Sequence, residues 1–244
     1  MEGIDLTSVI SSKAGTQIDL KNPIMIASGT FGYDGYGRGV TPQMPLQDLG
    51  AVIPKTVTRV EREGNPEPRW FPTSFREARE AKDAIYLNSI GLANPGIEHA
   101  MMVMAPEWAA WDATVVLSMS ADSSPEFGEM ARMTKGVNGF DAIELNLSCP
   151  NIEDGAMFSH SPILARAATE AVRSETDRPL FVKLAPNVPD VTEVVKAVEN
   201  GGTDAITLCN TIPAMAWDHV SGRPVLGGIT GGLSGPALKA VALA

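Results

Sequence analysis

The sequence predicts an α/β protein, and three observations lead to that class. The chain has 244 residues, of which 44% are hydrophobic and 20% charged, the balance of a globular protein with enough apolar surface for a core. Short apolar runs recur along the chain, and each is apolar on both alternations. Helix-like segments separate these runs. A repeated order of strand and helix is typical of proteins built on a parallel sheet.

The apolar runs are the predicted strands. A run that is apolar on both alternations is expected to be buried on both faces, as parallel strands covered by helices are. The runs are NPIMIASG (22–29), GAVIPKTVT (50–58), ATVVLSMSA (113–121), DAIELNLSCP (141–150), RPLFVKLAP (178–186) and DAITLCNT (204–211). The helices expected between them cover 124–137, 161–176 and 188–202. Pro189 and Asp190 near the start of the last segment, and Gly201 past its end, are common helix boundary residues.

Both an open dinucleotide-binding sheet and a TIM barrel fit this order, and two details favour the barrel. No strand is followed by a G-x-G-x-x-G sequence that opens a helix. A barrel gathers its strand ends around one mouth, and polar residues follow several of them: Ser28, Lys55, Asn146, Cys149, Lys183 and Asn210. A complete (β/α)8 barrel has eight strands, whereas about six βα units precede Ala244. We therefore expect residues 1–244 to form a single TIM-barrel domain, truncated at the C-terminus.

Charge and cysteine content argue against several classes of protein. Lys and Arg number 19 and Asp and Glu 29, a net charge of −10, so a basic face for nucleic acid is not expected. No stretch approaches the ~18 consecutive apolar residues of a membrane span, and the N-terminus lacks a secretory signal pattern. The two cysteines exclude a disulfide scaffold and argue against a metal or iron–sulfur site. The expected compartment is the cytoplasm.

Two lysines stand inside apolar strands. Lys55 lies in AVIPKTVT and Lys183 in LFVKLAP. A lysine in such a place is paired, neutralised or located at an open strand end, and a single one is usually structural. Because both lie near carboxyl strand ends, we expect them to hold an anion, or a developing negative charge, at the barrel mouth.

Amide and thiol side chains gather in the same loops. Several converging amides suit a flat ring that carries carbonyl and N–H groups, although a single Asn near a loop is more often a cap or turn residue. The asparagines are Asn88, Asn146, Asn151 and Asn210. Cys149 is followed by Pro150, which ends the strand and places the thiol on the loop over the mouth, where a thiolate acts as a base. Cys209, inside a strand, is interpreted as a packing residue.

A glycine-rich stretch closes the chain at 227–238, GGITGGLSGPAL. Ser234 and Gly235 precede Pro236 and a helical pattern, an arrangement whose free N–H groups can meet a phosphate. Glycine-rich turns are common, so the pattern gains weight only at the top of a barrel strand, where phosphates bind.

These motifs together resemble the dihydroorotate dehydrogenase family, most closely the catalytic subunit of its class 1B branch. The matching stretches run in the family's order from about residue 22 to 244: NPIMIASGTFGY, VIPKTVT, GNPEPR, LNSIGLANPG, IELNLSCPN, VKLAPNV, LCNT and GGLSGPALK. The cysteine in NLSCPN resembles class 1, since the membrane-associated class 2 enzymes carry serine there.

The resemblance implies an FMN-containing TIM barrel that oxidises (S)-dihydroorotate to orotate in de novo pyrimidine biosynthesis. By position, Cys149 resembles the base that removes the C5 proton, while hydride from C6 passes to flavin N5. The residues that resemble substrate contacts are Lys55, Asn88, Asn146, Asn151, Asn210 and Thr211. Those that resemble FMN contacts are Ala27, Ser28, Lys55, Thr56, Asn146, Lys183, Ser234 and Gly235. Lys183 fits the position near flavin N1 and O2.

The resemblance leaves the electron acceptor and the partner open. Class 1B enzymes pass electrons to NAD through an FAD and iron–sulfur partner subunit, whereas class 1A enzymes use fumarate; a homodimer or a heterotetramer is expected. Two departures stand out: Ser118 replaces the asparagine that usually ends the third strand, and the family's main phosphate-binding turns would lie beyond Ala244, which predicts weak FMN binding. Two alternatives remain: a dihydropyrimidine dehydrogenase-like flavoenzyme, although Asn151 stands where those proteins often carry histidine, or an inactive barrel remnant.

Overall fold

The computed structural model describes residues 4–32, 45–72, 85–148, 157–236 and 238–243. Its central feature is a set of parallel strands. Their bounds are β3 (Met25–Ile26), β4 (Ala51–Val52), β7 (Val116–Met119), β8 (Ala142–Asn146), β9 (Leu180–Lys183) and β10 (Ala205–Thr207). β3 pairs with β4, and β7, β8, β9 and β10 pair in that order, all in parallel. Parallel bridges from Val52 to Val115 and from Val57 to Met119 join the two sets. The strands predicted from the apolar runs are therefore confirmed.

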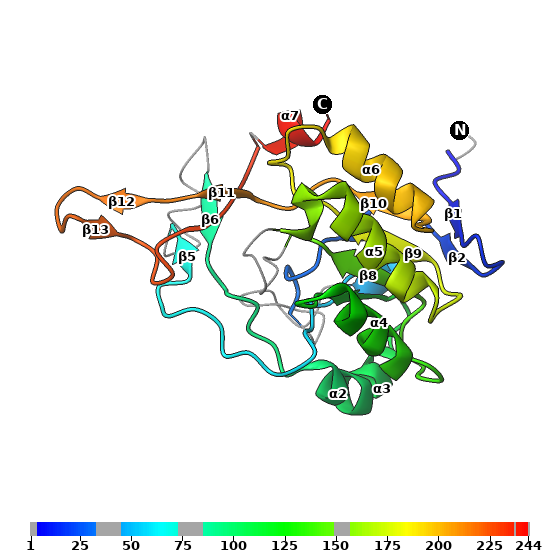
Figure 1. Ribbon diagram of the computed structural model, residues 1–244. Coiled ribbons are helices and arrows are strands. Elements are labelled where there is room, and N and C mark those ends of the chain that lie inside the picture. Colours follow the sequence, from blue (N-terminus) through cyan, green and yellow to red (C-terminus); the bar gives the residue numbers. More distant parts are fainter. Residues whose placement is uncertain (1–3, 33–44, 73–84, 149–156, 237, 244) are drawn as a thin grey trace.

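Helices cover the outer side of this array, and α4, α5 and α6 lie next to one another in Figure 1. Their bounds are α4 (Ser124–Met133), α5 (Pro162–Arg173) and α6 (Val191–Asn200). Each begins after a side-chain cap, from Ser123, Ser161 and Asp190 respectively. The predicted ranges extended beyond each of these helices. No helix in the described ranges is long and apolar enough to cross a membrane.

A shorter helical stretch follows β6 (Tyr86–Asn88) and adds to this outer layer. It consists of α2 (Ile97–His99), the π-helical η2 (Ala100–Met104) and α3 (Ala105–Trp108). Two isolated 3-10 turns, η1 (Leu46–Asp48) and η3 (Phe158–His160), lie in connecting segments. Trp108 of α3 and Phe158 of η3 are among the largest fully buried side chains and belong to the same core cluster as the helices, whereas Leu46 of η1 packs in a separate cluster with Phe31 and Val52.

Alternation along the strands separates an outer from an inner face. On β8, Ile143 and Leu145 belong to the large core cluster that also contains residues of α4, α5 and α6. Ala142, on the other alternation, belongs to a second cluster with Val116 and Phe181. The inner face thus begins with an apolar layer and continues toward the carboxyl strand ends with Glu144 and Asn146, which share the parity of Ala142.

An antiparallel hairpin, which sequence reasoning missed, closes the inner apolar layer. It consists of β1 (Ser8–Ser11) and β2 (Gln17–Leu20), joined by a turn in which Gly15 has φ of 93°. Ile18 and Leu20 are buried in the cluster of the inner face. Because the hairpin packs on the layer farthest from the carboxyl strand ends, it forms the floor of the barrel interior.

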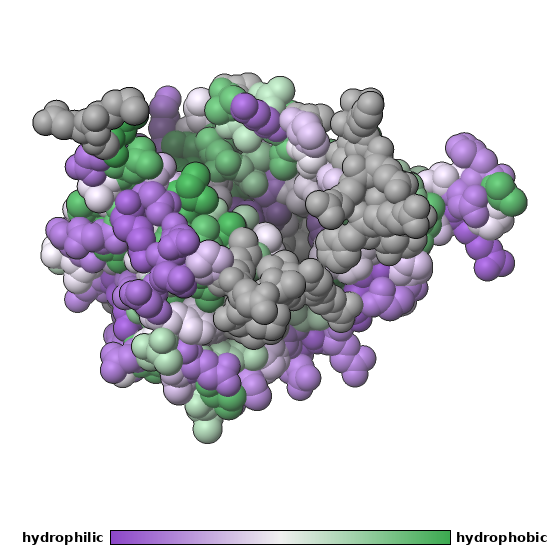
Figure 2. Space-filling model, turned by 180° about the vertical axis from the view of Figure 1, so that it is seen from behind, coloured by the Kyte–Doolittle hydropathy of each residue, from purple (hydrophilic) through white to green (hydrophobic). Residues whose placement is uncertain are grey.

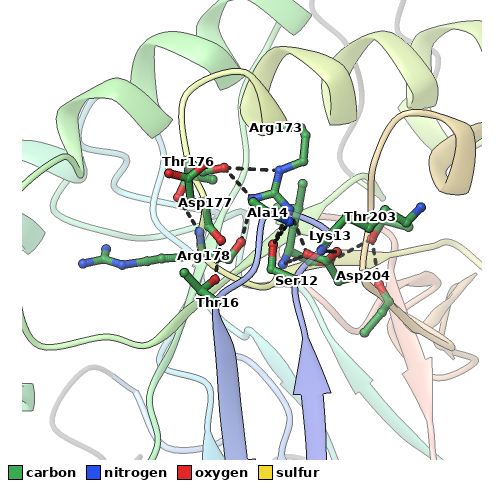
Figure 3. Close-up of polar contacts among 12 residues, drawn as sticks. Ser12, Lys13, Ala14, Thr16, Arg173, Thr176, Asp177, Arg178, Thr203 and Asp204 are labelled. Atoms are coloured by element: carbon green, nitrogen blue, oxygen red, sulfur yellow. Dashed lines mark hydrogen bonds and ion pairs between the residues drawn. The ribbon is translucent and has the colours of Figure 1, made fainter.

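Hydrogen bonds connect the turn of this hairpin to an ion pair of the barrel (Figure 3). The Asp204 carboxylate accepts hydrogen bonds from Lys13 N at 2.8 Å, Arg173 Nη1 at 2.8 Å and Leu180 N at 2.9 Å. Lys13 Nζ donates to the Glu199 carbonyl, and Arg173 also donates to carbonyls of the loop before β9. One buried carboxylate thereby links the hairpin, α5 and the start of β9.

A second, antiparallel sheet lies to one side of the barrel (left in Figure 1) and was not predicted. Its strands, in the order β11–β14–β6–β5, are β11 (Ile212–Ala214), β14 (Gly231–Ser234), β6 (Tyr86–Asn88) and β5 (Trp70–Phe71). A ribbon of β12 (Trp217–Asp218) and β13 (Arg223–Pro224) extends from it. Figure 2, seen from behind, shows the projecting end as largely hydrophilic. The chain then continues to α7 (Leu238–Ala242).

Candidate active site

The carboxyl ends of the parallel strands carry the polar residues singled out in the sequence. Asn146 and Lys183 are the last residues of β8 and β9, whereas Ser28, Lys55 and Asn210 follow β3, β4 and β10 within a few residues. Since parallel strands end at the same edge, the structure places these side chains around one mouth. Cys149 and Asn151 lie outside the described residues.

Three side chains at the ends of β8 and β10 form one hydrogen-bonded cluster. Asn146 Oδ1 accepts from Ser148 Oγ at 2.9 Å and from Asn210 Nδ2 at 3.3 Å. Asn210 Nδ2 also donates to Ser148 Oγ at 2.6 Å, and Asn210 Oδ1 accepts from Thr211 N at 2.8 Å. With the amide oxygen of Asn146 fully used, the orientation of its head group is fixed.

A cavity of about 190 Å³ opens beside this cluster. Ser148, Asn210 and Thr211 line it on the barrel side, and Gly231 and Gly232 of β14 line it on the side of the antiparallel sheet. A Cβ on Gly232 would lie 1.9 Å from Thr211 Oγ1, so the backbone of β14 approaches the barrel mouth as only glycine permits. The antiparallel sheet therefore forms one wall of the mouth.

A row of hydroxyl groups crosses the inner face below the mouth. Ser28 Oγ lies 2.9 Å from Thr56 Oγ1, which lies 2.9 Å from Ser118 Oγ. Thr56 is 2% exposed and Ser118 is fully buried. The position where the resemblance led us to expect asparagine is thus occupied by a hydroxyl that contacts Thr56, one of the residues proposed to touch the cofactor.

Lys183 is the most deeply placed cation of the mouth, at 8% exposure. Among the described residues, no hydrogen bond or close ion pair engages its ammonium group. Its charge nevertheless acts on two neighbours, since it opposes the burial that raises the pKa of the Glu144 carboxyl and of the Cys209 thiol. A buried ammonium group that lacks a hydrogen-bonding partner can donate to an anionic ligand.

Glu144 is a residue of the site that sequence reasoning missed. Its side chain is fully buried on β8, and burial raises the pKa of the carboxyl against the opposing effects of Lys183 and Thr207. Thr207 Oγ1 donates to its Oε2 at 2.9 Å. The signal was present in the sequence, because a lone carboxylate within AIELN raises the same question as a lone lysine within LFVKLAP.

Cys209 differs in part from its interpretation as a packing residue. It is a free cysteine of intermediate exposure just after β10. Burial raises the pKa of its thiol, and the nearby Lys183 charge opposes that shift. Cys209 is therefore partly exposed and does not belong to the apolar core clusters of the described residues.

Lys55 and Ala27 flank the opposite side of the mouth. A Cβ built on Gly29 would lie 3.4 Å from Lys55 Cδ and 3.6 Å from Lys55 Nζ, so the lysine side chain extends over the turn that follows β3. Ala27 is exposed in that turn, and its carbonyl accepts from Thr30 N at 3.2 Å. Ser28 lies between them, and its hydroxyl donates a hydrogen bond to the Pro54 carbonyl at 3.0 Å.

The remaining predicted residues belong to the antiparallel sheet. Asn88, in β6, donates from Nδ2 to the Gly232 carbonyl at 3.3 Å and so adjoins the cavity wall. Ser234 ends β14 opposite Tyr86, and Gly235 follows it with φ of 127°. The glycine-rich stretch is therefore not at the top of a parallel barrel strand, as the phosphate interpretation required, because β14 pairs antiparallel with β6 and β11.

Comparison with known proteins decides the family. The family model described as dihydroorotate dehydrogenase matches residues 12–244. The chain belongs to the dihydroorotate dehydrogenase family. Enzymes of this family carry FMN, and the TIM-barrel class predicted from the sequence agrees with that membership.

Similar proteins are catalytic subunits of dihydroorotate dehydrogenase B (NAD(+)). The chain is 40% identical over 228 residues to that of Desulforamulus reducens, covering 93% of this chain and 71% of the relative. It is 39% identical over 227 residues to that of Oceanobacillus iheyensis, again covering 93% and 71%. A crystal structure of dihydroorotate dehydrogenase from Eimeria tenella, in complex with ferulenol, shares the fold with a TM-score of 0.63 at 23% identity, covering 92% of this chain and 65% of that one.

The residues at the mouth fit an FMN ring. Reduced flavin carries negative charge on its pyrimidine side, and the buried Lys183 ammonium group, without a close partner among the described residues, is the cation that such a ring requires. The hydroxyls of Ser28 and Thr56 and the amide of Asn146 supply uncharged polar groups around it. Lys183 is thus the feature that fits the cofactor best.

Proposed function

We propose that this chain, as a single domain over residues 1–244, oxidises (S)-dihydroorotate to orotate in de novo pyrimidine biosynthesis. One observation carries the proposal: a buried lysine without a close partner in the described part of the chain lies opposite Asn146 of an amide cluster, and Ser148 and Asn210 of that cluster line a cavity of about 190 Å³. A cation for the flavin and amides for a flat substrate ring are the two binding functions that this reaction needs.

The substrate side uses the amides and one thiol. Asn146, whose oxygen is already occupied by Ser148 and Asn210, retains its Nδ2 hydrogens for a substrate carbonyl. Lys55 supplies a charge for the substrate carboxylate. The further substrate contacts in this proposal are Asn88, Asn151, Asn210 and Thr211. Cys149 takes the proton from C5, so that the C5–C6 double bond forms as C6 gives up hydride.

The cofactor side uses the first strands and Lys183. Bound FMN supplies the acceptor for the hydride from C6. Lys183 holds a positive charge close to that acceptor, and the buried Thr56 hydroxyl, fixed between Ser28 and Ser118, offers an oriented polar contact. The further FMN contacts in this proposal are Ala27, Ser28, Lys55 and Asn146, together with Ser234 and Gly235, which rest on the family resemblance and not on a place at the top of a barrel strand.

An electron-transfer partner is part of the proposal. The relatives are called catalytic subunits of an NAD(+)-dependent enzyme, a name that implies a second subunit. We propose that such a subunit, carrying FAD and an iron–sulfur cluster, accepts electrons from this chain in a heterotetramer. Co-purification of a flavin- and iron-containing subunit supports this arrangement, whereas turnover with fumarate by a homodimer contradicts it.

Two measurements on the purified chain test the activity. A titration with FMN, followed by quenching of flavin fluorescence, establishes binding. Dihydroorotate added anaerobically to the FMN-loaded chain should then bleach the visible flavin absorbance, with orotate formed in a one-to-one ratio. Uracil with a chemical reductant should give no dihydrouracil. Turnover of uracil would favour a dihydropyrimidine dehydrogenase-like activity, and a chain that binds no flavin would favour an inactive remnant.

A further inference from the structure

Glu144 is a fully buried carboxyl group to which the proposed reaction assigns no role. Its Oε2 accepts a hydrogen bond from Thr207, but its buried Oε1 has no hydrogen-bond partner among the described residues. Burying a carboxyl group in this way is unfavourable unless a nearby group compensates it, because the unsatisfied oxygen has lost its hydrogen bonds to water. Among the described residues, the charge that compensates it comes from one direction.

That direction is the neighbouring strand β9. In the parallel register Asn146 faces Lys183 and Glu144 faces Phe181, so Glu144 lies one inward-facing position deeper than Lys183. Thr207 is level with Lys183 on β10, and its bond to Glu144 passes across β9. Glu144 is therefore held within the electrostatic reach of the Lys183 ammonium group by a hydroxyl from the far side of that strand.

Polar or charged groups from each of the neighbouring strands β7, β9 and β10 surround Glu144. Ser118 lies level with it on β7 and offers a hydroxyl, Lys183 offers a charge from β9, and Thr207 offers a hydroxyl from β10, with the Cys209 thiol beyond it. Within the described part of the chain, Lys183 is the one charge that acts on the carboxyl, and it opposes the desolvation that raises the carboxyl pKa. Burial therefore favours the protonated carboxyl, whereas the Lys183 charge favours the carboxylate.

We propose that Glu144 is a positioning residue that acts through Lys183: it is the counter-charge of the ammonium group while no anion is bound there, and it takes up a proton from solvent when an anion binds. In the protonation step the carboxylate becomes a carboxylic acid, and no other bond changes. Lys183 is then free to pair with the arriving negative charge, which reduced flavin supplies if the proposed function holds.

Infrared difference spectroscopy of the FMN-loaded chain, reduced minus oxidised, tests this step. A protonated-carboxyl C=O band should appear on reduction in the wild type and be absent in Glu144→Gln, which keeps the shape and can still accept from Thr207. Glu170→Gln, a matched change at an exposed carboxylate of α5, should keep the band. A wild-type spectrum without the band, or a band that persists in Glu144→Gln, would overturn the proposal.

A second arm needs no FMN and separates failure of this inference from failure of the proposed function. In the apoprotein, carbon NMR of labelled glutamate follows the Glu144 titration directly. Lys183→Met should raise the Glu144 pKa by at least about one unit, a tenfold change in proton affinity. Thr207→Val, which leaves the charge in place, should raise it by less. An unchanged titration in Lys183→Met would overturn the coupling even if flavin binding and dihydroorotate oxidation were both observed.

Discussion

Arg173 Nη1 lies 2.8 Å from Asp204 Oδ2, and the aspartate side chain is completely shielded from solvent. The carboxylate also accepts from Lys13 N in the hairpin connection and from Leu180 N at the start of β9. Since a single charged group joins segments from the two ends of the chain, its removal affects the barrel floor and the sheet together.

Asp204→Ala should destabilise the protein by about 3 kcal/mol, because it leaves the largely buried Arg173 charge without its partner. Urea unfolding followed by circular dichroism measures this. The matched control is Glu170→Ala, which breaks the exposed Arg166–Glu170 pair of α5 and should cost less than about 0.5 kcal/mol. Equal losses in the two variants would show that the Asp204 network has no special weight.

Cys149→Ser should slow anaerobic flavin reduction by dihydroorotate by at least ~100-fold while FMN binding stays intact, since a positioned base contributes about that much. Stopped-flow absorbance of the flavin measures the rate. Cys209→Ser provides the comparison between the two thiols. A large loss of rate in Cys209→Ser with a normal rate in Cys149→Ser would show that the base is Cys209 and not Cys149.

Lys183→Ala should weaken FMN binding roughly 10- to 100-fold, the range expected when one charge-assisted contact is lost. Equilibrium dialysis with FMN determines the Kd. Lys196→Ala, on the exposed side of α6, removes the same charge away from the mouth and should bind FMN as the wild type does. Unchanged retention of flavin in Lys183→Ala would contradict the role given to the buried ammonium group.

Glu175 predicts a distinct dependence of stability on pH. Hydrogen bonds from Arg132 and Lys135 lower the pKa of its carboxyl from 4.5 to about 2. Because the folded value lies below the unfolded one, the carboxylate stabilises the fold above about pH 4.5, and this contribution is lost as the pH falls toward 2. Glu175→Gln should therefore lower the Tm near neutral pH, and the two proteins should converge near pH 2.

Calorimetry at several pH values measures that difference. Lys135→Met is the matched variant, since it removes one of the two donors and should shift the loss of stability toward higher pH. A Tm difference between wild type and Glu175→Gln that stays constant over the whole range would contradict the lowered pKa.

The parallel strands and the helices over them could be predicted because each is a local pattern. Runs such as ATVVLSMSA are apolar on both faces, and capping residues such as Ser161 mark helix starts. The antiparallel sheet could not be predicted, since β14 is glycine-rich and its partners β6 and β11 are distant in sequence. The hairpin was missed because β1 is largely exposed and shows no continuous apolar run.

The candidate site also divides into residues that a local pattern reveals and residues that only long-range contacts reveal. Lys183 was found because a charge within an apolar strand is conspicuous in the sequence. Glu144 was overlooked although it has the same signature, and only the coordinates show that Thr207 and Lys183 surround it. Ser234 and Gly235 were proposed as cofactor contacts because their local sequence suits a phosphate, whereas their strand pairing is a long-range property that local sequence does not contain.

The hairpin beneath the barrel links the first twenty residues to the electrostatics of the mouth. Ile18 and Leu20 cap the apolar layer on which the polar groups around Glu144 and Lys183 rest. An N-terminal deletion would admit solvent from below and raise the local dielectric constant, which weakens the attraction between those two charges. Expression variants that trim this segment would consequently alter the electron affinity of any flavin bound above, although the removed residues lie on the far side of the barrel from the cofactor site.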